Sequence, residues 1–351
     1  ILSLFIGTSL FLIGKKSNKK LNFIEQLILI ISVYILIGFL ISIPYYLSNL
    51  KVTFLSSFFE AVSGLTGTGF STFKNIKYLD PTLILWRSSS QWIGGLFFLF
   101  FLIILFSNKS FNYKMTNLTY SGESNYKSEE NIKNNLLKIF LLYSFLSLLY
   151  FTLLNVSGVR LFNSLNLTMS LVSSGGFLPS DSLNEIIITN FQKIILIFTL
   201  IFSMLNFYFL FNIFNKRAIL KSHNEDFYLL AFAAIFTLLI YFNNFEGLNI
   251  IISVLSSLTN SGITLFETDN NLSLYFLLLT IVGGSLISNT SGIKLSRFYI
   301  LLKITAAEII KLISPNSVIN KTIFNSENKI NEDNVKISFL IFISFFFSLF
   351  I

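Results

Sequence analysis

Long apolar stretches without a charged side chain alternate along the sequence with short polar segments. A helix needs about 20 apolar residues to cross the hydrocarbon core of a bilayer. Complete charge-free stretches of this kind occupy residues 27–50, 88–108, 139–159, 194–215, 227–245 and 270–293. Two shorter apolar stretches stand at the ends of the sequence, at 1–14 and 337–351. The pattern predicts an all-α polytopic membrane protein.

The composition agrees with this class of protein. Hydrophobic residues make up 53% of the 351 residues and charged residues only 12%, whereas a soluble domain has about 25% charged residues. The first apolar stretch lacks the basic region and the small-residue cleavage site of a signal peptide, so we expect a membrane helix there. Because the sequence starts without a methionine and its last apolar stretch is short, we expect the natural protein to be longer.

Basic residues are concentrated in alternate polar segments. Most of the 25 lysine and arginine residues lie at 15–20, 109–138, 216–221 and 294–336, which the positive-inside rule assigns to the cytoplasm. The net charge of +8 therefore reports topology, and we expect contact with membrane lipid but not with nucleic acid. The sequence contains no cysteine, which excludes disulfides and thiolate metal sites within it.

Three outer segments between the long stretches resemble one another. Each has a short apolar part followed by a cluster of small polar residues and glycines. Aligned on the last glycine, the clusters are Thr66, Gly67, Thr68 and Gly69, then Ser173, Ser174, Gly175 and Gly176, then Thr259, Asn260, Ser261 and Gly262. Such a repeat predicts helix–pore loop–helix units around a central pore, with three complete units and the start of a fourth.

The physical chemistry of these clusters favours an ion pathway. A helix of about ten residues spans roughly 15 Å, half the bilayer core, so each segment must enter the membrane and return. Non-helical backbone is tolerated at that depth only where protein buries it or water reaches it. Glycines let carbonyls face one axis, helix carboxyl ends favour a cation, and rings of oxygens can replace an ion's hydration shell. The alternative is that each cluster is an ordinary extracellular turn.

The apolar stretch at 270–293 contains a further polar cluster, GGSLISNTSG. Glycines and side-chain hydroxyls both weaken a helix at this point. We predict a break, with a plain kink at a closely packed glycine pair as the alternative. The predicted loop residues are Gly283, Gly284, Ser285, Ser288, Asn289, Thr290, Ser291, Gly292 and, at its inner end, Lys294. Lys294 and Arg297 can also serve simply as positive-inside anchors.

Five charged or amide side chains lie close to the outer clusters. Glu60 precedes the first cluster, where it either supports the loop or contacts the ion. Arg87 and Gln91 are four residues apart at the start of the next long stretch, and we expect both to brace the first loop from outside. Asp181 and Glu185 follow the second cluster, where they either attract cations to the mouth or are solvated.

Catalytic chemistry finds little support. The single histidine, His223, lies in a short inner loop beside Asn224, Glu225 and Asp226, and we expect it to be a solvated loop residue rather than a base or a ligand. A membrane-embedded enzyme would need Asp or His within its helices, yet the long stretches contain neither. A substrate-coupled secondary transporter would share broken helices but would not need three glycine clusters. We expect no catalytic residue and no enzyme.

Taken together, the motifs resemble one family. FFEAVSGLTGTGFSTF followed by WRSSSQWIGG, then SSGGF, then GGSLISNTSGIK are similar in order and spacing to the TrkH/TrkG/KtrB superfamily of potassium-translocating membrane proteins. The stretch at 1–14 favours the TrkH branch. The resemblance implies four pore units in a homodimer of the cell inner membrane. It also implies K+ uptake through a selectivity filter of backbone carbonyls at the three clusters, with no covalent cofactor.

The resemblance further implies a gate and a partner. The loop at 283–292, with Lys294, would block the pore until a cytoplasmic nucleotide-binding subunit of the TrkA or KtrA type moves it. Coupling to Na+ or H+, and transport of Na+ or another monovalent cation, are alternatives within the superfamily. Gly67 and Asn260 depart from the threonines of the family pattern, and the fourth pore loop is not in the sequence.

The expected division of the chain follows from these units. We expect an additional helix at 1–14, pore unit 1 at 21–108, a cytoplasmic linker at 109–134, pore unit 2 at 135–213, pore unit 3 at 225–305, a second linker at 306–336 and the start of pore unit 4 at 337–351.

Overall fold

The computed structural model describes residues 2–15, 21–107, 129–214, 224–242, 247–265, 270–317, 320–324 and 330–349. Outside these residues lie His223, the basic segment at 216–221 and most of the expected linker at 109–134. The α-helices are α1 (Leu2–Gly14), α2 (Phe23–Tyr46), α3 (Phe54–Thr66), α4 (Pro81–Ser107), α6 (Glu129–Val156), α7 (Leu161–Ser173), α8 (Asn190–Met204), α9 (Phe207–Phe214), α10 (Asn224–Tyr241), α11 (Gly247–Thr259), α12 (Asn270–Val282), α13 (Leu295–Ile313) and α14 (Glu332–Leu349).

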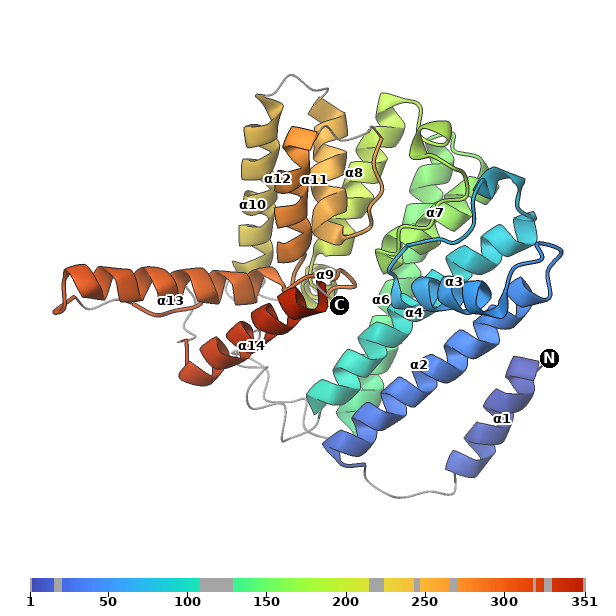
Figure 1. Cartoon of the computed structure of the whole chain (residues 1–351), viewed down its shortest axis with the longest axis horizontal. Helices are drawn as coiled ribbons and strands as arrows, with labels where there is room; N and C mark the ends of the chain where they lie inside the picture. The colour runs from blue at the N-terminus through green and yellow to red at the C-terminus, as the bar shows by residue number, and fades with distance from the viewer. Residues whose placement is uncertain are drawn as a thin grey trace.

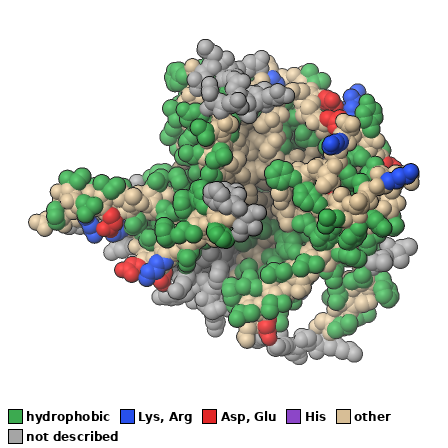
Figure 2. Space-filling model, viewed as in Figure 1, with side chains coloured by type: hydrophobic (Ala, Val, Ile, Leu, Met, Phe, Trp, Pro, Cys, Tyr) green, Lys and Arg blue, Asp and Glu red, His purple; other side chains and the backbone are tan. Residues whose placement is uncertain are grey.

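Four helices of the described chain are long and apolar enough to cross a membrane: α2, α4, α6 and α10. Large apolar side chains cover much of the visible surface, and charged side chains gather in a few places at its edges (Figure 2). Such a surface suits lipid, because hydrocarbon does not penalise exposed leucine or phenylalanine. The prediction of an all-helical, multi-pass membrane protein is therefore consistent with the surface and with the helix lengths.

Two of the predicted membrane stretches are interrupted. The stretch at 270–293 ends its helix at Val282, and α13 begins only at Leu295, so the break lies at the predicted polar cluster. The stretch at 194–215 was predicted to be continuous, but α8 ends at Met204 and α9 begins at Phe207. No glycine or proline marks this second break. Its cause is a set of long-range hydrogen bonds described below.

Each of the short helices α3, α7 and α11 packs between neighbouring helices. Helix α3 packs between α2 and α4, α7 packs against α4, α6 and α8, and α11 packs against α8, α10 and α12 (Figure 1). Local signals set the ends of these elements. Thr53 accepts a hydrogen bond from the amide of Ser56 at the start of α3, and Pro81 opens α4 at the position where a missing N–H costs nothing.

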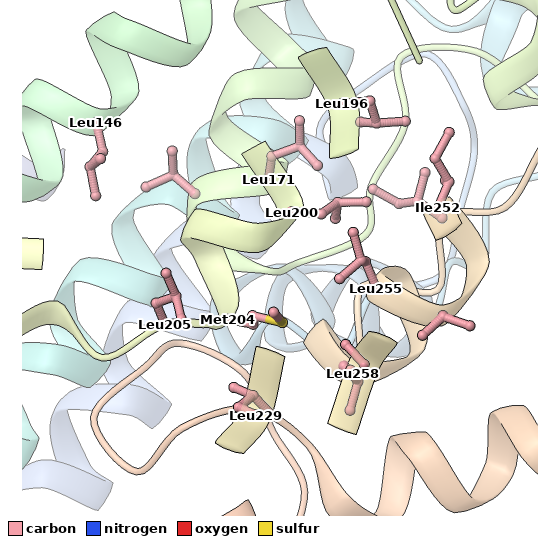
Figure 3. Close-up of a cluster of buried hydrophobic side chains, with 14 of the residues drawn as sticks. Leu146, Leu171, Leu196, Leu200, Met204, Leu205, Leu229, Ile252, Leu255 and Leu258 are labelled. Atoms are coloured by element: carbon pink, nitrogen blue, oxygen red, sulfur yellow. The ribbon is translucent and has the colours of Figure 1, made fainter. Parts of the chain in front are cut away.

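The largest buried cluster joins helices α6, α7 and α8 to helices α10, α11 and α12. At its centre, side chains of α8 pack against side chains of α11 (Figure 3). The residues from α8 are Leu196, Leu200 and Met204, and those from α11 are Ile252, Leu255 and Leu258. In a lipid environment such contacts stabilise through close packing more than through exclusion of water. The core therefore fixes α8, which ends at the break after Met204, relative to α11, which ends at the third cluster.

Helix α13 extends past the position where the third unit was expected to end. It continues to Ile313, whereas the third unit was expected to end at 305. In Figure 1 this helix extends sideways from the helix bundle, and α14 lies beside it. Residues 306–313, expected at the start of the second linker, are thus part of this long amphipathic helix.

Candidate functional site

The three short helices end in the same hydrogen-bonded motif. At the end of α3, the amide of Gly67 donates to the carbonyl of Gly64 at 3.1 Å and the amide of Thr68 donates to that of Ser63 at 3.0 Å. The equivalent bonds follow α7, from Ser174 and Gly175, and α11, from Asn260 and Ser261. Both bonds together define the Schellman motif, which uses a left-handed residue to end a helix. The chain therefore leaves each short helix in the same way.

The backbone angles repeat across the three clusters. The residue that follows each helix has a φ of 69° at Gly67, 54° at Ser174 and 58° at Asn260. Two residues later, the last glycine of each cluster again has a positive φ, with 80° at Gly69, 80° at Gly176 and 65° at Gly262. Glycine and asparagine adopt this region more readily than threonine. The two departures from the family pattern, Gly67 and Asn260, thus stand where a left-handed residue is needed.

The clusters contact each other in chain order. A methyl group added at Gly69 would lie 2.5 Å from the carbonyl oxygen of Gly175. One added at Gly176 would overlap the carbonyl oxygen of Ser261. The first cluster thus lies against the second, and the second against the third. The fold brings together three segments that are far apart in sequence, with their backbones in van der Waals contact.

A buried ion pair supports the first cluster. The Arg87 guanidinium donates to the Glu60 carboxylate at 2.8 Å, and both side chains are almost fully buried. Glu60 also accepts from the Ser71 hydroxyl at 2.9 Å and from the Thr72 amide at 2.9 Å. Arg87 in addition stacks over Phe177, with its guanidinium carbon 4.2 Å from the ring centre. The Glu60 carboxylate is thus engaged in holding the chain that leaves the cluster.

Gln91 contacts a different loop from the one expected. Its amide nitrogen donates to the carbonyl of Gly175, and its amide oxygen accepts from the Phe177 amide at 3.2 Å. The expectation that Gln91 braces the first loop was wrong, because one turn of α4 beyond Arg87 the helix already faces the second loop. Helix α4 therefore supports two clusters with two side chains.

The outer acidic residues are bound to the first unit. The Asp181 carboxylate accepts a hydrogen bond from the Ile76 amide. Glu185 lies 3.8 Å from the Lys77 ammonium, with both side chains well exposed. Their contacts link the outer turn at Ile76–Tyr78 to the segment that follows the second cluster. A link between the first two units is therefore the role that the geometry gives them.

The segment at 283–292 leaves the helix and returns to almost the same point. The amide of Ile293 donates to the carbonyl of Ile281 at 2.9 Å, and the amide of Lys294 donates to that of Val282 at 2.9 Å. Gly283 and Gly292 have φ of 69° and 88°, and a methyl group at Gly292 would lie 2.9 Å from the Gly283 Cα. Glycine is therefore required at both 283 and 292, where the two ends of this loop pass close to each other. We call residues 283–292 the intramembrane loop.

Lys294 folds back into the intramembrane loop instead of facing an open mouth. Its ammonium donates to the Ser288 hydroxyl at 3.2 Å, to the Thr290 hydroxyl at 3.0 Å and to the carbonyl oxygens of both residues. The side chain is buried. An ammonium group has three donors and no acceptor, so four oxygens gathered around it form a compact centre for the loop.

The intramembrane loop also contacts the second cluster. The side-chain amide of Asn289 donates to the carbonyl of Val172 at 3.0 Å, at the carboxyl end of α7. Gly95 of α4 makes room for this approach, because a methyl group there would lie 2.9 Å from the Ser173 Cβ and 3.0 Å from the Asn289 nitrogen. The loop of the third unit thus lies directly beside the helix end of the second.

Two buried carboxylates lie at the start of α10 and carry no role in the sequence-based expectations. Glu225 and Asp226, expected beside His223 at an inner loop, occupy the first turn of α10 and are 9% and 1% exposed. Asp226 accepts from the Asn206 amide at 2.9 Å, and Glu225 accepts from the Leu286 amide at 3.1 Å. Their position directly before an apolar stretch was the available signal, since acidic residues favour the first turn of a helix.

A family model described as "TrkH: Cation transport protein" matches residues 1–270. The chain belongs to the TrkH family. This confirms the family suggested by the glycine clusters and the WRSSSQWIGG motif. Members of the TrkH family are transporters, so the alternative of a membrane-embedded enzyme is set aside.

The relatives agree with this assignment. The chain is 27% identical over 315 residues to "Uncharacterized cation transporter MJ1485" of Methanocaldococcus jannaschii, covering 87% of this chain but 64% of that protein. It is 26% identical over 350 residues to "Trk system potassium uptake protein TrkH" of Escherichia coli, covering 90% of this chain and 69% of that protein. The chain thus spans about two thirds of the length of either relative.

A solved structure shows the same fold. The crystal structure of "the Potassium Transporter TrkH from Vibrio parahaemolyticus" superposes with a TM-score of 0.78 at 18% identity. The superposition covers 94% of this chain and 70% of that chain. The described chain therefore has an all-helical TrkH-like fold.

Proposed function

We propose that this chain forms most of the pore of a membrane protein for potassium uptake. The observation that carries the proposal is the contact of three clusters that share one backbone conformation, each at the carboxyl end of a short helix. In the proposed pore, each repeated unit consists of one short helix and the two helices that precede and follow it in the chain. A fourth cluster would complete the ring.

The chemistry of the proposed filter rests on backbone oxygens. Each short helix has 13 residues and spans about 20 Å, too short for a bilayer core of about 30 Å. Its carboxyl end carries a partial negative charge, which stabilises a cation near the membrane centre. Carbonyls of residues 66–69, 173–176 and 259–262 would replace the hydration shell of K+, with the hydroxyls of Thr66, Thr68 and Thr259 as additional oxygens.

The intramembrane loop is the proposed gate. Its Asn289 reaches the end of α7, so the loop stands next to the second cluster and can obstruct the path beyond it. Opening would require the loop to move away from this position. The Trk system name of the relatives supports a regulatory cytoplasmic subunit of the TrkA type. A homodimer in the cell inner membrane completes the proposal.

The test is complementation of a bacterium deficient in K+ uptake by the full-length protein, with measurement of Rb+ flux and of its inhibition by Na+. Gly176→Ala should abolish selective flux, because the new methyl group would strike the Ser261 carbonyl and φ is 80°. Gly158→Ala is the matched control, since it lies outside the clusters and its φ is also positive, at 91°, but the nearest atom to the added group is 4.0 Å away. It should retain more flux.

The same experiment decides between K+ and other cations. Rb+ flux that resists an excess of Na+ supports K+ selectivity. Flux of Na+ in the parent protein would instead favour the alternative of a Na+ transporter within the superfamily. Unchanged selectivity and flux in Gly176→Ala would contradict the filter assignment.

A further inference from the structure

The two buried carboxylates at the start of α10 join two chain breaks. Asp226 binds the amide of Asn206, in the gap between α8 and α9. Glu225 binds the amide of Leu286, within the intramembrane loop. The two acidic residues are adjacent in sequence, so one turn of one helix holds backbone from the second unit and from the third.

The two breaks are also bonded directly to each other. The amide of Ser285 donates to the carbonyl of Met204 at 3.1 Å, and the amide of Phe207 donates to the carbonyl of Ile287 at 2.9 Å. In a continuous helix, the amides of Asn206 and Phe207 would bond to carbonyls four residues earlier. Here they bond to Asp226 and Ile287 instead. The break in the second unit is thus maintained by the loop of the third.

Nearby cations balance one of the two acids. The Lys294 ammonium and the Arg297 guanidinium both interact electrostatically with the Glu225 carboxylate. Buried charges persist in proteins when they are paired and hydrogen-bonded. Glu225, Asp226, Lys294 and the four backbone bonds therefore form one connected network around the loop.

We propose that Glu225 and Asp226 act as a two-carboxylate clamp that keeps the intramembrane loop seated in the break between α8 and α9. The gate then has two parts: the loop cannot leave its site unless the α8–α9 junction also rearranges. Both acids are positioning residues, because they act through backbone amides and not on the transported ion. The inference rests on the proposed function, in that the loop is taken as the gate.

The test uses cysteine labelling, because the sequence has no cysteine to interfere. Ile287→Cys is introduced into the full-length protein, freed of any other cysteine, and its reaction rate with a membrane-permeant maleimide is measured in native membranes. The Ile287 side chain is 5% exposed, so the clamped loop should react slowly. Glu225→Gln and Asp226→Asn are then added singly.

Both variants should increase the labelling rate about tenfold, equivalent to about 1.4 kcal/mol of loop release. Uncoupled Rb+ leak through the protein should rise with it. Each variant keeps the size of the side chain and one acceptor oxygen, and protein amount in the membrane is checked by size-exclusion chromatography. Glu332→Gln is the matched control, because it also lies in the first turn of a helix but is exposed and pairs only loosely with Lys336, at 3.8 Å.

The outcomes separate the clamp from the transport assignment. Labelling of both clamp variants at the rate of the parent protein and of Glu332→Gln would overturn the clamp. Faster labelling without Rb+ flux in any variant would support the clamp while contradicting potassium transport. If a variant fails to accumulate, the other one, measured in the same way, decides.

Discussion

The guanidinium of Arg87 and the carboxylate of Glu60 are joined across two helices at 2.8 Å, with both groups shielded from solvent. Glu60 belongs to α3 and Arg87 to α4, so the pair fixes the first short helix to the long helix that follows it. Because Glu60 also accepts from the Thr72 amide, the pair holds the chain that follows the first cluster as well as the helix that precedes it.

Loss of this pair should destabilise the protein. Glu60→Gln leaves the Arg87 charge buried without its partner, which typically costs about 3–5 kcal/mol. We expect a clearly lower midpoint of thermal unfolding in detergent, followed by intrinsic fluorescence. Lys77→Ala is the control, because the exposed pair with Glu185 at 3.8 Å should contribute no more than about 1 kcal/mol. Equal midpoints for the two variants would contradict the assigned role.

Gln91 should govern selectivity more than stability. Gln91→Leu removes both hydrogen bonds to the second loop, so the Gly175 carbonyl loses the donor that orients it. Gln91→Glu retains an acceptor for the Phe177 amide but places an oxygen against the Gly175 carbonyl. We expect Rb+ flux in both variants to become more sensitive to Na+, with the larger change in Gln91→Glu. If both variants keep the ion preference of the parent, Gln91 does not orient the filter.

The glycine pair of α4 should not tolerate a methyl group. Gly94→Ala would strike the carbonyl of Leu65, at the end of α3. Overpacking of this kind costs about 1–3 kcal/mol or more, and here it would displace the first cluster. Gly38→Ala provides the comparison, because its methyl group would lie 3.4 Å from Val62, a distance that a small shift can relieve. The thermal midpoint should fall strongly only for Gly94→Ala.

Lys294 should determine how compact the intramembrane loop is. Lys294→Met keeps the length of the side chain but removes the donors that gather the oxygens of Ser288 and Thr290. We expect faster thiol labelling at Ile287→Cys and an increased Rb+ leak. Lys311→Met, at an exposed lysine of α13, should change neither. A loop that stays protected in Lys294→Met would show that the two carboxylates and the backbone bonds hold it without the lysine.

Local sequence signals predicted the ends of the short helices and one of the breaks. Gly69, Gly176 and Gly262 mark left-handed backbone that few other residues adopt, and this requirement is visible in a single sequence. Likewise, the glycines at 283, 284 and 292 weaken a helix by themselves. These features depend on the conformational preferences of the residues present, so no knowledge of the tertiary structure is needed.

The remaining features depend on partners that are distant in sequence. The break after Met204 has one local signal, Asn206, whose side chain accepts from the Tyr208 amide at the start of α9. The long-range bonds to Asp226 and to the intramembrane loop hold the rest of it. For the same reason Glu225 and Asp226 resembled ordinary loop residues. Gln91 was assigned to the wrong loop because its partners, Gly175 and Phe177, are brought to it by the packing of α4 against α7. Helix contacts, rather than residue patterns, decide these points.

The shared ending of α3, α7 and α11 has a consequence for evolution. Gly67, Ser174 and Asn260 are three different side chains in one backbone shape, so natural selection can exchange them without moving the carbonyls beside them. The backbone shape alone therefore does not dictate which side chain stands at these positions. Comparisons among distant members should instead score how readily each residue adopts the left-handed conformation, which is the property that the fold preserves.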